Sequence, residues 1–143
     1  MKIDFAREIA LKIIYNVDEK KAYSNILLDE FLNENRQKLN IKDVNFISEI
    51  VYGVISKKLT LDVIIKKYSN IKLNKISKWT LNILRIGAYQ IIFLDKVPKS
   101  AAVNECVNLA KKYNYKSANF VNAILRKIEK KIVLEIFFNL FIY

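Results

Sequence analysis

Histidine is absent from the 143 residues, and cysteine, glycine and proline are scarce. The lack of histidine removes the commonest general base and the commonest metal ligand. The single cysteine, Cys106, permits neither an internal disulfide nor a multi-cysteine zinc site. Two glycines and one proline nearly exclude a turn-rich all-β sandwich or barrel. We therefore expect a protein of the reducing cytoplasm that contains few tight turns.

Acidic residues are few relative to basic ones, and the imbalance is uneven along the chain. The sequence has 25 Lys and Arg against 14 Asp and Glu, a net charge of +11. Residues 1–50 carry 8 basic and 9 acidic groups, residues 51–104 carry 10 and 2, and residues 105–143 carry 7 and 3. Codon bias would explain an excess of lysine over arginine, but not of basic over acidic groups. The composition favours a nucleic-acid partner over a merely solvated basic surface.

Apolar residues recur at three- and four-residue steps almost throughout the chain. Hydrophobic residues make up 52% of the sequence and charged residues 27%, the balance of one globular domain. This pattern predicts an all-α bundle of six to seven helices with short loops. The expected helix starts are Asp4, Ser24, Asn40 (in a capping box with Asp43), Thr60, Asn74, Pro98 or Ser100, and Ser117.

The run from Trp79 to Leu94 is apolar on nearly every side and is expected to be the centre of the core. It is too short, and too often interrupted by Asn82, Arg85 and Gln90, to span a membrane. Gly87 within this run is expected to let a neighbouring helix approach closely. We expect no contact with a membrane.

Residue patterns typical of catalysis are missing from the sequence. Gly53 and Gly87 are isolated within helical patterns, so they form no glycine-rich phosphate loop. The carboxylates of Asp18 and Glu19 are sequence neighbours that point apart, and we expect them on a solvated face. Cys106 lies among apolar residues and is expected to be a small buried side chain rather than a nucleophile. We expect no cofactor, no metal site and no catalysis by this chain alone.

Three segments resemble the NusB-like RNA-binding domain, in the same order along the chain. They are residues 6–15; residues 84–91 with 96–98, 102–105 and 109–112; and residues 119–126. The resemblance covers roughly residues 3–128. It implies a NusB-like helical bundle and an RNA-binding domain over residues 1–131.

Two branches of that family fit the sequence. Residues 49–55 and 61–65, and Tyr89-Gln90-Ile91, resemble more closely the N-terminal domain of the rRNA cytosine-5 methyltransferase RsmB. The methyltransferase domain itself is absent. The first interpretation is therefore the non-catalytic, rRNA-recognising domain of a truncated RsmB-type enzyme. The alternatives are a free-standing transcription antitermination factor of the NusB branch and a protein-interaction module without RNA binding.

The resemblance also implies which residues contact RNA. Arg7 would pair with phosphate and Tyr15 would stack on an unpaired base. The alternative is an exposed arginine and a tyrosine half-packed on the bundle. Phe120 matches a base-stacking phenylalanine of the family, although its spacing also fits core packing. The full set of expected RNA-binding residues is Lys2, Arg7, Lys12, Tyr15, Lys116, Ser117, Asn119 and Phe120.

The last twelve residues depart from the family pattern, because ten of residues 132–143 are apolar. We treat them as an atypical apolar tail that extends the last helix and packs across the bundle or into a second copy of the chain. The expected partners are thus RNA, in particular rRNA, and a small-subunit ribosomal protein or a methyltransferase domain. A homodimer formed through the tail is a further expectation.

Overall fold

The computed structural model describes residues 2–141, and within this range it contains seven α-helices and no strand. The helices are α1 (Phe5–Lys20), α2 (Ser24–Glu34), α3 (Ile41–Ser56), α4 (Lys58–Tyr68), α5 (Lys78–Phe93), α6 (Lys99–Tyr113) and α7 (Ala118–Phe141). Three single-turn 3-10 helices lie in the connections: η1 (Arg36–Lys38), η2 (Leu73–Lys75) and η3 (Tyr115–Ser117). The predicted all-α bundle is confirmed.

Local sequence explains where several helices begin. The Asp4 carboxylate accepts a hydrogen bond from the backbone N–H of Arg7 at 3.2 Å. Asn40 and Asp43 form the predicted capping box, each side chain accepting from the backbone N–H of the other. The start of α5 was predicted at Asn74, but that residue lies in η2, and Ser77 caps the helix instead by accepting from the Thr80 N–H.

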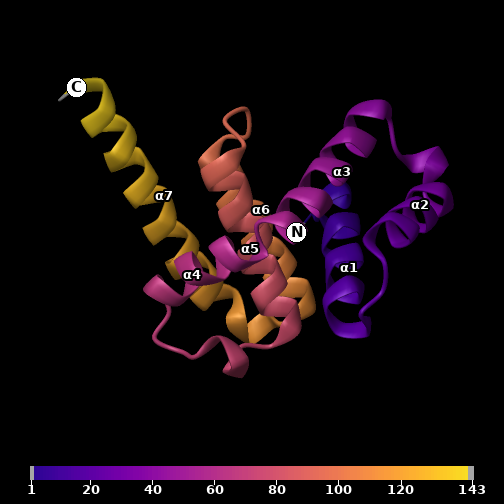
Figure 1. The fold of residues 1–143 in the computed structure, drawn as a ribbon, viewed down its shortest axis with the longest axis horizontal. Coiled ribbons are helices and arrows are strands. Elements are labelled where there is room, and N and C mark those ends of the chain that lie inside the picture. Colours follow the sequence, from indigo (N-terminus) through magenta and orange to yellow (C-terminus); the bar gives the residue numbers. More distant parts are fainter. Residues whose placement is uncertain (1, 142–143) are drawn as a thin grey trace.

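Helix α5 is the centre of the core, as predicted. Every residue from Thr80 to Ile91 is buried, and α5 contacts α1, α3, α4, α6 and α7 (Figure 1). A Cβ atom at Gly87 would lie 2.5 Å from Leu125 of α7 and 3.2 Å from the Cys106 sulfur of α6. Glycine at this position therefore permits the close approach of neighbouring helices. Burial raises the pKa of the Cys106 thiol to about 12, which keeps it protonated and unreactive.

The predicted tail lies in the second half of α7. The helix continues without a break past residue 131, so the expected helical extension is confirmed up to Phe141. Burial ends near Ile132, and residues 133–141 extend beyond the bundle (Figure 1). The expectation that the tail packs across its own bundle is wrong, because the side chains of residues 133–141 are exposed and the end of α7 points away from the other helices (Figure 1). Ile142 and Tyr143 lie outside the described residues.

Between residues 2 and 141, no helix combines the length and the apolar character that crossing a membrane requires.

Candidate functional site

Three aromatic rings stack where α1, α5 and α6 meet. Tyr15 lies parallel to Trp79, with ring centroids 3.7 Å apart and an angle of 1° between the ring planes. Tyr113 packs on Trp79 at 4.5 Å with a tilt of 31°. Tyr15 is half-buried and gives one ring face to Trp79, so only its other face is left for a base.

A buried carboxylate ties this aromatic stack to α6. Glu8 of α1 accepts hydrogen bonds from Lys112 Nζ at 2.5 Å and from the Tyr113 hydroxyl at 2.6 Å. Burial alone would raise the pKa of Glu8, but the hydrogen bonds from Lys112 and Tyr113 and the charges of Lys112 and Lys12 outweigh it and lower the pKa. Burial of Tyr113 itself, together with its hydrogen bond to Glu8 and the Glu8 charge, raises the pKa of Tyr113. Glu8 is therefore ionised at neutral pH and holds the end of α6 against α1.

A hollow of about 220 Å³ with both polar and apolar lining residues lies between η2, the start of α5 and the connection from α6 to α7. We call it the α5–α7 hollow, and its lining residues are Ile71, Lys75, Ile76, Ser77, Thr80, Asn114, Lys116, Ser117 and Phe120. Asn114 Nδ2 donates to Thr80 Oγ1 at 2.9 Å and to Ser77 Oγ at 3.2 Å. These bonds fix the wall that faces Lys116. Trp79 and Tyr113 of the stack are the chain neighbours of Thr80 and Asn114, which line the hollow.

The hollow brings three of the predicted RNA-binding residues together. Lys116 is exposed, Ser117 is half-buried and donates its hydroxyl proton to the Asn114 carbonyl at 2.7 Å, and the Phe120 ring is half-buried. Asn119 is exposed one residue before Phe120 and does not line the hollow. Phe120 also packs against the core, so both of its predicted roles are compatible with its position.

Lys12 and Tyr15 lie on the neighbouring part of α1, each half-exposed. Lys12 is close enough to Glu8 to lower its pKa. Lys2 is exposed just before α1 begins.

Arg7 lies in a different environment from the one the resemblance implies. Its side chain is buried, its Nε donates to Gln90 Oε1 at 2.8 Å, and its Nη1 forms an ion pair with Asp4. The guanidinium carbon is 5.0 Å from the centroid of the Phe46 ring. Neither the expected phosphate contact nor the alternative of an exposed arginine describes this geometry. Arg7 instead joins α1, α3 and α5.

Arg7 is also distant from the hollow. Arg7 is hydrogen-bonded to Gln90 of α5, whereas Thr80 of the same helix lines the hollow. Residues 80 and 90 are ten residues apart, which is about 15 Å along an α-helix. The predicted site residues therefore fall into three groups. Lys116, Ser117 and Phe120 line the hollow, with Asn119 next to them in sequence. Tyr15 belongs to the aromatic stack and Lys12 lies near Glu8 on the same helix, while Lys2 and Arg7 belong to the start of α1.

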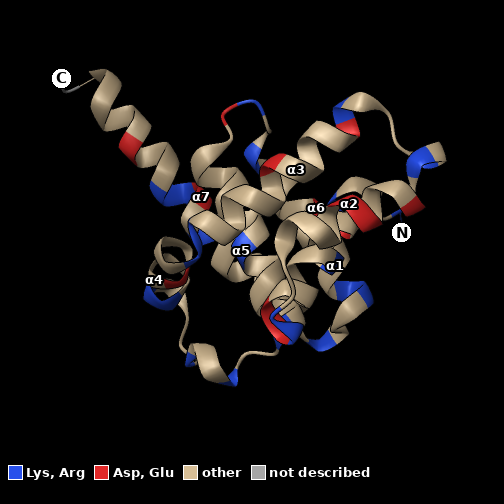
Figure 2. Ribbon diagram, turned by 45° about the vertical axis from the view of Figure 1, so that its right-hand side comes forward, with Lys and Arg blue, Asp and Glu red and all other residues tan. Residues whose placement is uncertain are grey.

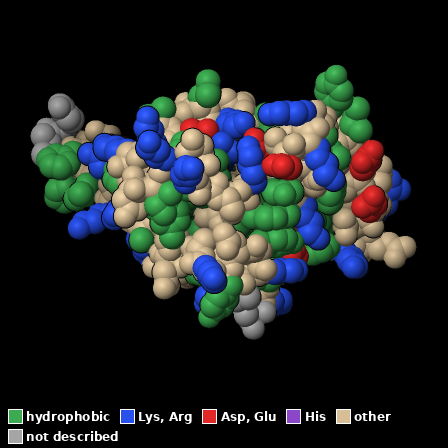
Figure 3. Space-filling model, turned by 90° about the horizontal axis from the view of Figure 1, so that it is seen from below, with side chains coloured by type: hydrophobic (Ala, Val, Ile, Leu, Met, Phe, Trp, Pro, Cys, Tyr) green, Lys and Arg blue, Asp and Glu red, His purple; other side chains and the backbone are tan. Residues whose placement is uncertain are grey.

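Several residues of this surface were not among the predicted site residues. Lys75, Thr80 and Asn114 line the hollow, and Trp79 and Tyr113 form the stack. The excess of basic residues over 51–104 was the sequence signal that could have drawn attention to Lys75. In the view from below, hydrophobic side chains gather near the centre of the face, with Lys and Arg around them and few Asp or Glu (Figure 3).

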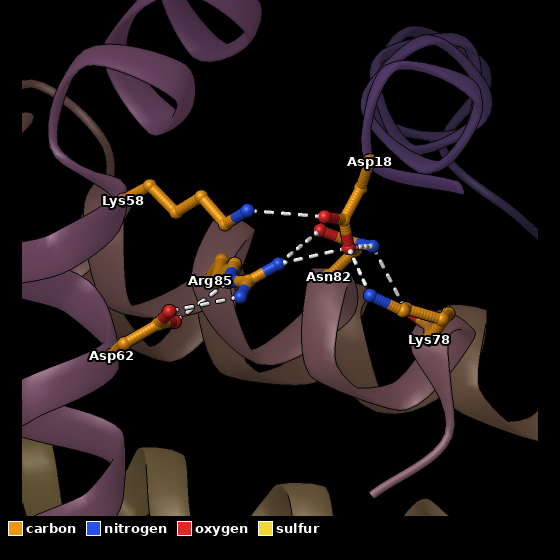
Figure 4. A network of polar contacts seen from close by, with 6 residues as sticks. All are labelled: Asp18, Lys58, Asp62, Lys78, Asn82 and Arg85. Carbon is orange, nitrogen blue, oxygen red and sulfur yellow. Dashed lines mark hydrogen bonds and ion pairs between the residues drawn. The ribbon is translucent and has the colours of Figure 1, made fainter. Parts of the chain in front are cut away.

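A second polar cluster joins α1, α4 and α5 inside the protein (Figure 4). Arg85 donates to both carboxylate oxygens of Asp62, at 2.7 and 2.9 Å, and to Asp18 at 3.2 Å. Asp18 also pairs with Lys58 at 3.1 Å and Lys78 at 3.5 Å, and it accepts from Asn82 at 3.2 Å. The expectation that Asp18 lies on a solvated face is wrong, because its side chain is 6% exposed.

Asp18 stays ionised at neutral pH although its side chain is buried. Desolvation would raise its pKa, but hydrogen bonds from Lys58 and Asn82 and the charge of Arg85 prevail and hold the pKa well below its usual range. The Asp18 carboxylate and the Arg85 guanidinium each have several partners, and Asp62 accepts two hydrogen bonds from Arg85, which is the arrangement that a buried ionic cluster needs. This cluster stabilises the packing of three helices and exposes no reactive group.

Within residues 2–141, no three His, Cys, Asp or Glu side chains are grouped so that they could hold a metal ion.

Comparison with known proteins gives a consistent family assignment. The NusB family profile matches residues 5–130. The transcription antitermination protein NusB of Ruminiclostridium cellulolyticum is 40% identical over 127 residues, covering 87% of this chain and 86% of that protein. The probable ribosomal RNA small subunit methyltransferase B of Bacillus subtilis is 36% identical over 132 residues, covering 92% of this chain. This chain spans only 29% of the length of that methyltransferase.

Solved structures agree with the sequence comparison. The crystal structure of the antitermination factors NusB and NusE in complex with dsRNA contains a chain with a TM-score of 0.80 and 26% identity, covering 88% of this chain and 94% of that one. NusB of T. maritima has a TM-score of 0.79 at 25% identity, covering 91% and 93%. The helical architecture and the family profile together show that this chain belongs to the NusB family.

Proposed function

We propose that this chain is an RNA-binding factor of the NusB type that acts in transcription antitermination beside a protein of the NusE kind. The α5–α7 hollow carries the proposal, because it combines exposed lysines, a half-buried aromatic ring and fixed hydrogen-bonding side chains on one surface. Lysine neutralises phosphate and aromatic rings stack on unpaired bases. A NusB relative of similar fold was solved with NusE and dsRNA, which supports the same classes of partner here.

The roles of individual residues follow from their positions. Lys75 and Lys116 would pair with backbone phosphates, and Lys12 would do so on the adjoining surface of α1. Phe120 and the open face of Tyr15 would pack against bases or sugars. Ser117 and Asn119, at the start of α7, would add hydrogen bonds next to the first N–H groups of a helix, which favour negative charge.

The sequence matches are compatible both with the NusB-type factor, which we propose, and with the N-terminal domain of an RsmB-type methyltransferase. The match to NusB spans most of both chains, whereas the match to the methyltransferase spans less than a third of that enzyme. The RsmB-type interpretation keeps one supporting observation, the 36% identity over 92% of this chain. Both interpretations give the chain a binding role, with rRNA as the proposed target and the cytoplasm as the proposed location.

The proposal is tested by titrating the full chain with labelled single-stranded and double-stranded RNA at several salt concentrations. We expect the logarithm of the affinity to fall linearly with the logarithm of salt, with a slope of about −0.7 for each phosphate neutralised on a single strand. Absence of RNA binding at low salt would overturn the proposal.

A second measurement concerns the protein partner. Purified NusE-type protein and a separate RsmB-type methyltransferase domain are each mixed with this chain, and complex formation is followed by size-exclusion chromatography. The proposal predicts a complex with the NusE-type protein. A stable complex with the methyltransferase domain alone would favour the RsmB-type interpretation, and a protein complex without RNA affinity would favour the interaction module.

A further inference from the structure

Four lysines on α4 and η2, of which Lys75 also lines the hollow, form a basic surface that we call the basic ridge. Lys66 and Lys67 lie in the last turn of α4, and Lys72 and Lys75 lie in and beside η2. All four side chains are exposed. None of them takes part in the ion pairs found among the described residues.

Few acidic groups lie near the ridge, and the one that shares a groove with Lys67, Glu135, is paired with Lys131. No Asp or Glu occurs between residues 63 and 94. Asp62, the nearest acid in sequence, is turned to Arg85 and held there by two hydrogen bonds. On α7, which packs against α4, Glu129 pairs with Arg126 at 3.2 Å and Glu135 with Lys131 at 3.8 Å. The exposed lysines of the ridge thus form no ion pair among the described residues and can meet an external anion.

A structural role explains only two of the four lysines of the ridge. Lys66 and Lys67 lie at the C-terminal end of α4, where positive charge interacts favourably with the helix dipole. Lys72 and Lys75 follow that helix in a connection without such a dipole, and they contact no carboxylate. An exposed connection that concentrates like charges destabilises itself slightly, so an outside partner is the better explanation.

The ridge continues the α5–α7 hollow in space. Lys75 belongs to both surfaces, since it lines the hollow opposite the connection that carries Lys116. From there the lysines follow η2 to the end of α4, where Lys67 lines a groove shared with Lys131 of α7. Blue segments in Figure 2 follow this edge of the molecule through the connection between α4 and α5, with little red beside them.

We propose that the basic ridge is a second phosphate-binding surface, along which an RNA strand held in the α5–α7 hollow continues its backbone. The inference rests on the proposed RNA-binding function and extends it to a surface outside the hollow. Because the ridge offers ammonium groups and few groups that could bind base edges, it binds the backbone without regard to sequence. Longer RNA therefore gains affinity from the ridge, whereas an oligonucleotide that fills only the hollow does not.

The test compares two triple variants of the full chain that each lose three positive charges. The ridge variant carries Lys66→Gln, Lys67→Gln and Lys72→Gln, and it leaves Lys75 of the hollow unchanged. The control variant carries Lys38→Gln, Lys42→Gln and Lys96→Gln, at exposed positions in η1, at the start of α3 and in the connection from α5 to α6, away from η2 (Figure 1). Circular dichroism confirms that both variants keep their helices.

With the longer RNA, the ridge variant should show a salt dependence shallower by up to about 2, from three phosphates at about 0.7 each. The control variant should retain the slope of the unchanged chain, and the short oligonucleotide should bind all three proteins alike.

Equal slopes for the ridge and control variants would overturn the proposal that the ridge binds RNA, while leaving the proposed function in place. Loss of binding to anionic lipid vesicles with an unchanged RNA slope would also overturn it, and make the ridge a membrane-contact surface. Failure of the unchanged chain to bind RNA would overturn the proposed function itself.

Discussion

Two of the four arginines differ sharply in their surroundings from the lysines of the α5–α7 hollow and the basic ridge. Arg7 and Arg85 are buried, and each links several helices through ion pairs and hydrogen bonds. The lysines of the α5–α7 hollow and the basic ridge are exposed and face solvent. The planar guanidinium donates to two or three acceptors at once in a fixed geometry, whereas an ammonium is strongly hydrated and stays on a flexible stem. The contrast indicates a structural role for Arg7 and Arg85, and it agrees with the RNA-binding role that we propose for the exposed lysines of the hollow and the ridge.

The largest effect is expected from removing the buried arginine of the Asp18 cluster. Arg85→Ala leaves Asp18 and Asp62 without their shared partner, and we expect the free energy of unfolding to fall by about 3–5 kcal/mol. Lys78→Ala removes a half-exposed lysine from the same Asp18 and should cost about 0–1 kcal/mol. Urea denaturation of both variants measures the difference. Equal losses would show that burial does not distinguish the two residues.

The second prediction concerns pH. Because the pKa of Asp18 is lower in the folded state than its ordinary value of 3.8, its stabilising contribution is present in full above that value. The contribution declines as the pH falls below 3.8 and is lost once the pH passes the folded pKa. Glu8, whose pKa is lowered from 4.5, acts in the same direction.

Urea denaturation between pH 7 and pH 3 checks this prediction. Asp18→Asn should lower stability at pH 7 and make the decline on acidification shallower. Asp29→Asn, at an exposed position on α2, serves as the control and should leave both unchanged. An acid profile that Asp18→Asn does not alter would show that this carboxylate contributes nothing to the pH dependence.

These two predictions involve the part of the structure that sequence reasoning missed. Asp18 was placed on a solvated face because its carboxylate points away from that of its sequence neighbour Glu19, but its partner Arg85 is 67 residues away. Likewise, Gln90, which accepts from Arg7, is 83 residues distant. Such pairings depend on which helix faces meet, and helical periodicity predicts the faces without predicting their partners.

Features that depend on local sequence were predicted well. The capping box of Asn40 and Asp43 needs only four consecutive residues, and the burial of α5 follows from its composition. Gly87 and Cys106 were correctly assigned to close packing because they lie within apolar helical runs. Only some of the residues that line the hollow were predicted as site residues. Lys116, Ser117 and Phe120 lie close together in sequence, whereas Lys75 and Thr80 come near them only through tertiary packing.

A smaller effect on stability is expected from shortening α7. Deleting residues 133–143 removes side chains that are exposed between Val133 and Phe141, so the free energy of unfolding should change by less than about 1 kcal/mol. The exposed apolar helix should favour association with a second copy of the chain, and its deletion should reduce that association. Light scattering of the full and shortened chains measures both masses. If both chains scatter as monomers, the tail is not a contact between copies.

The central claim is tested most directly by two single substitutions that each remove one positive charge, Arg7→Gln and Lys116→Gln. For each variant, urea denaturation measures stability and an RNA titration over a range of salt measures the slope. The account predicts that Arg7→Gln lowers the free energy of unfolding by about 1–3 kcal/mol and keeps the RNA slope, because it removes a buried set of hydrogen bonds. Lys116→Gln should keep stability and make the slope shallower by about 0.7. The opposite pattern, with Arg7→Gln stable and weaker for RNA and Lys116→Gln unchanged in RNA binding, would contradict the account.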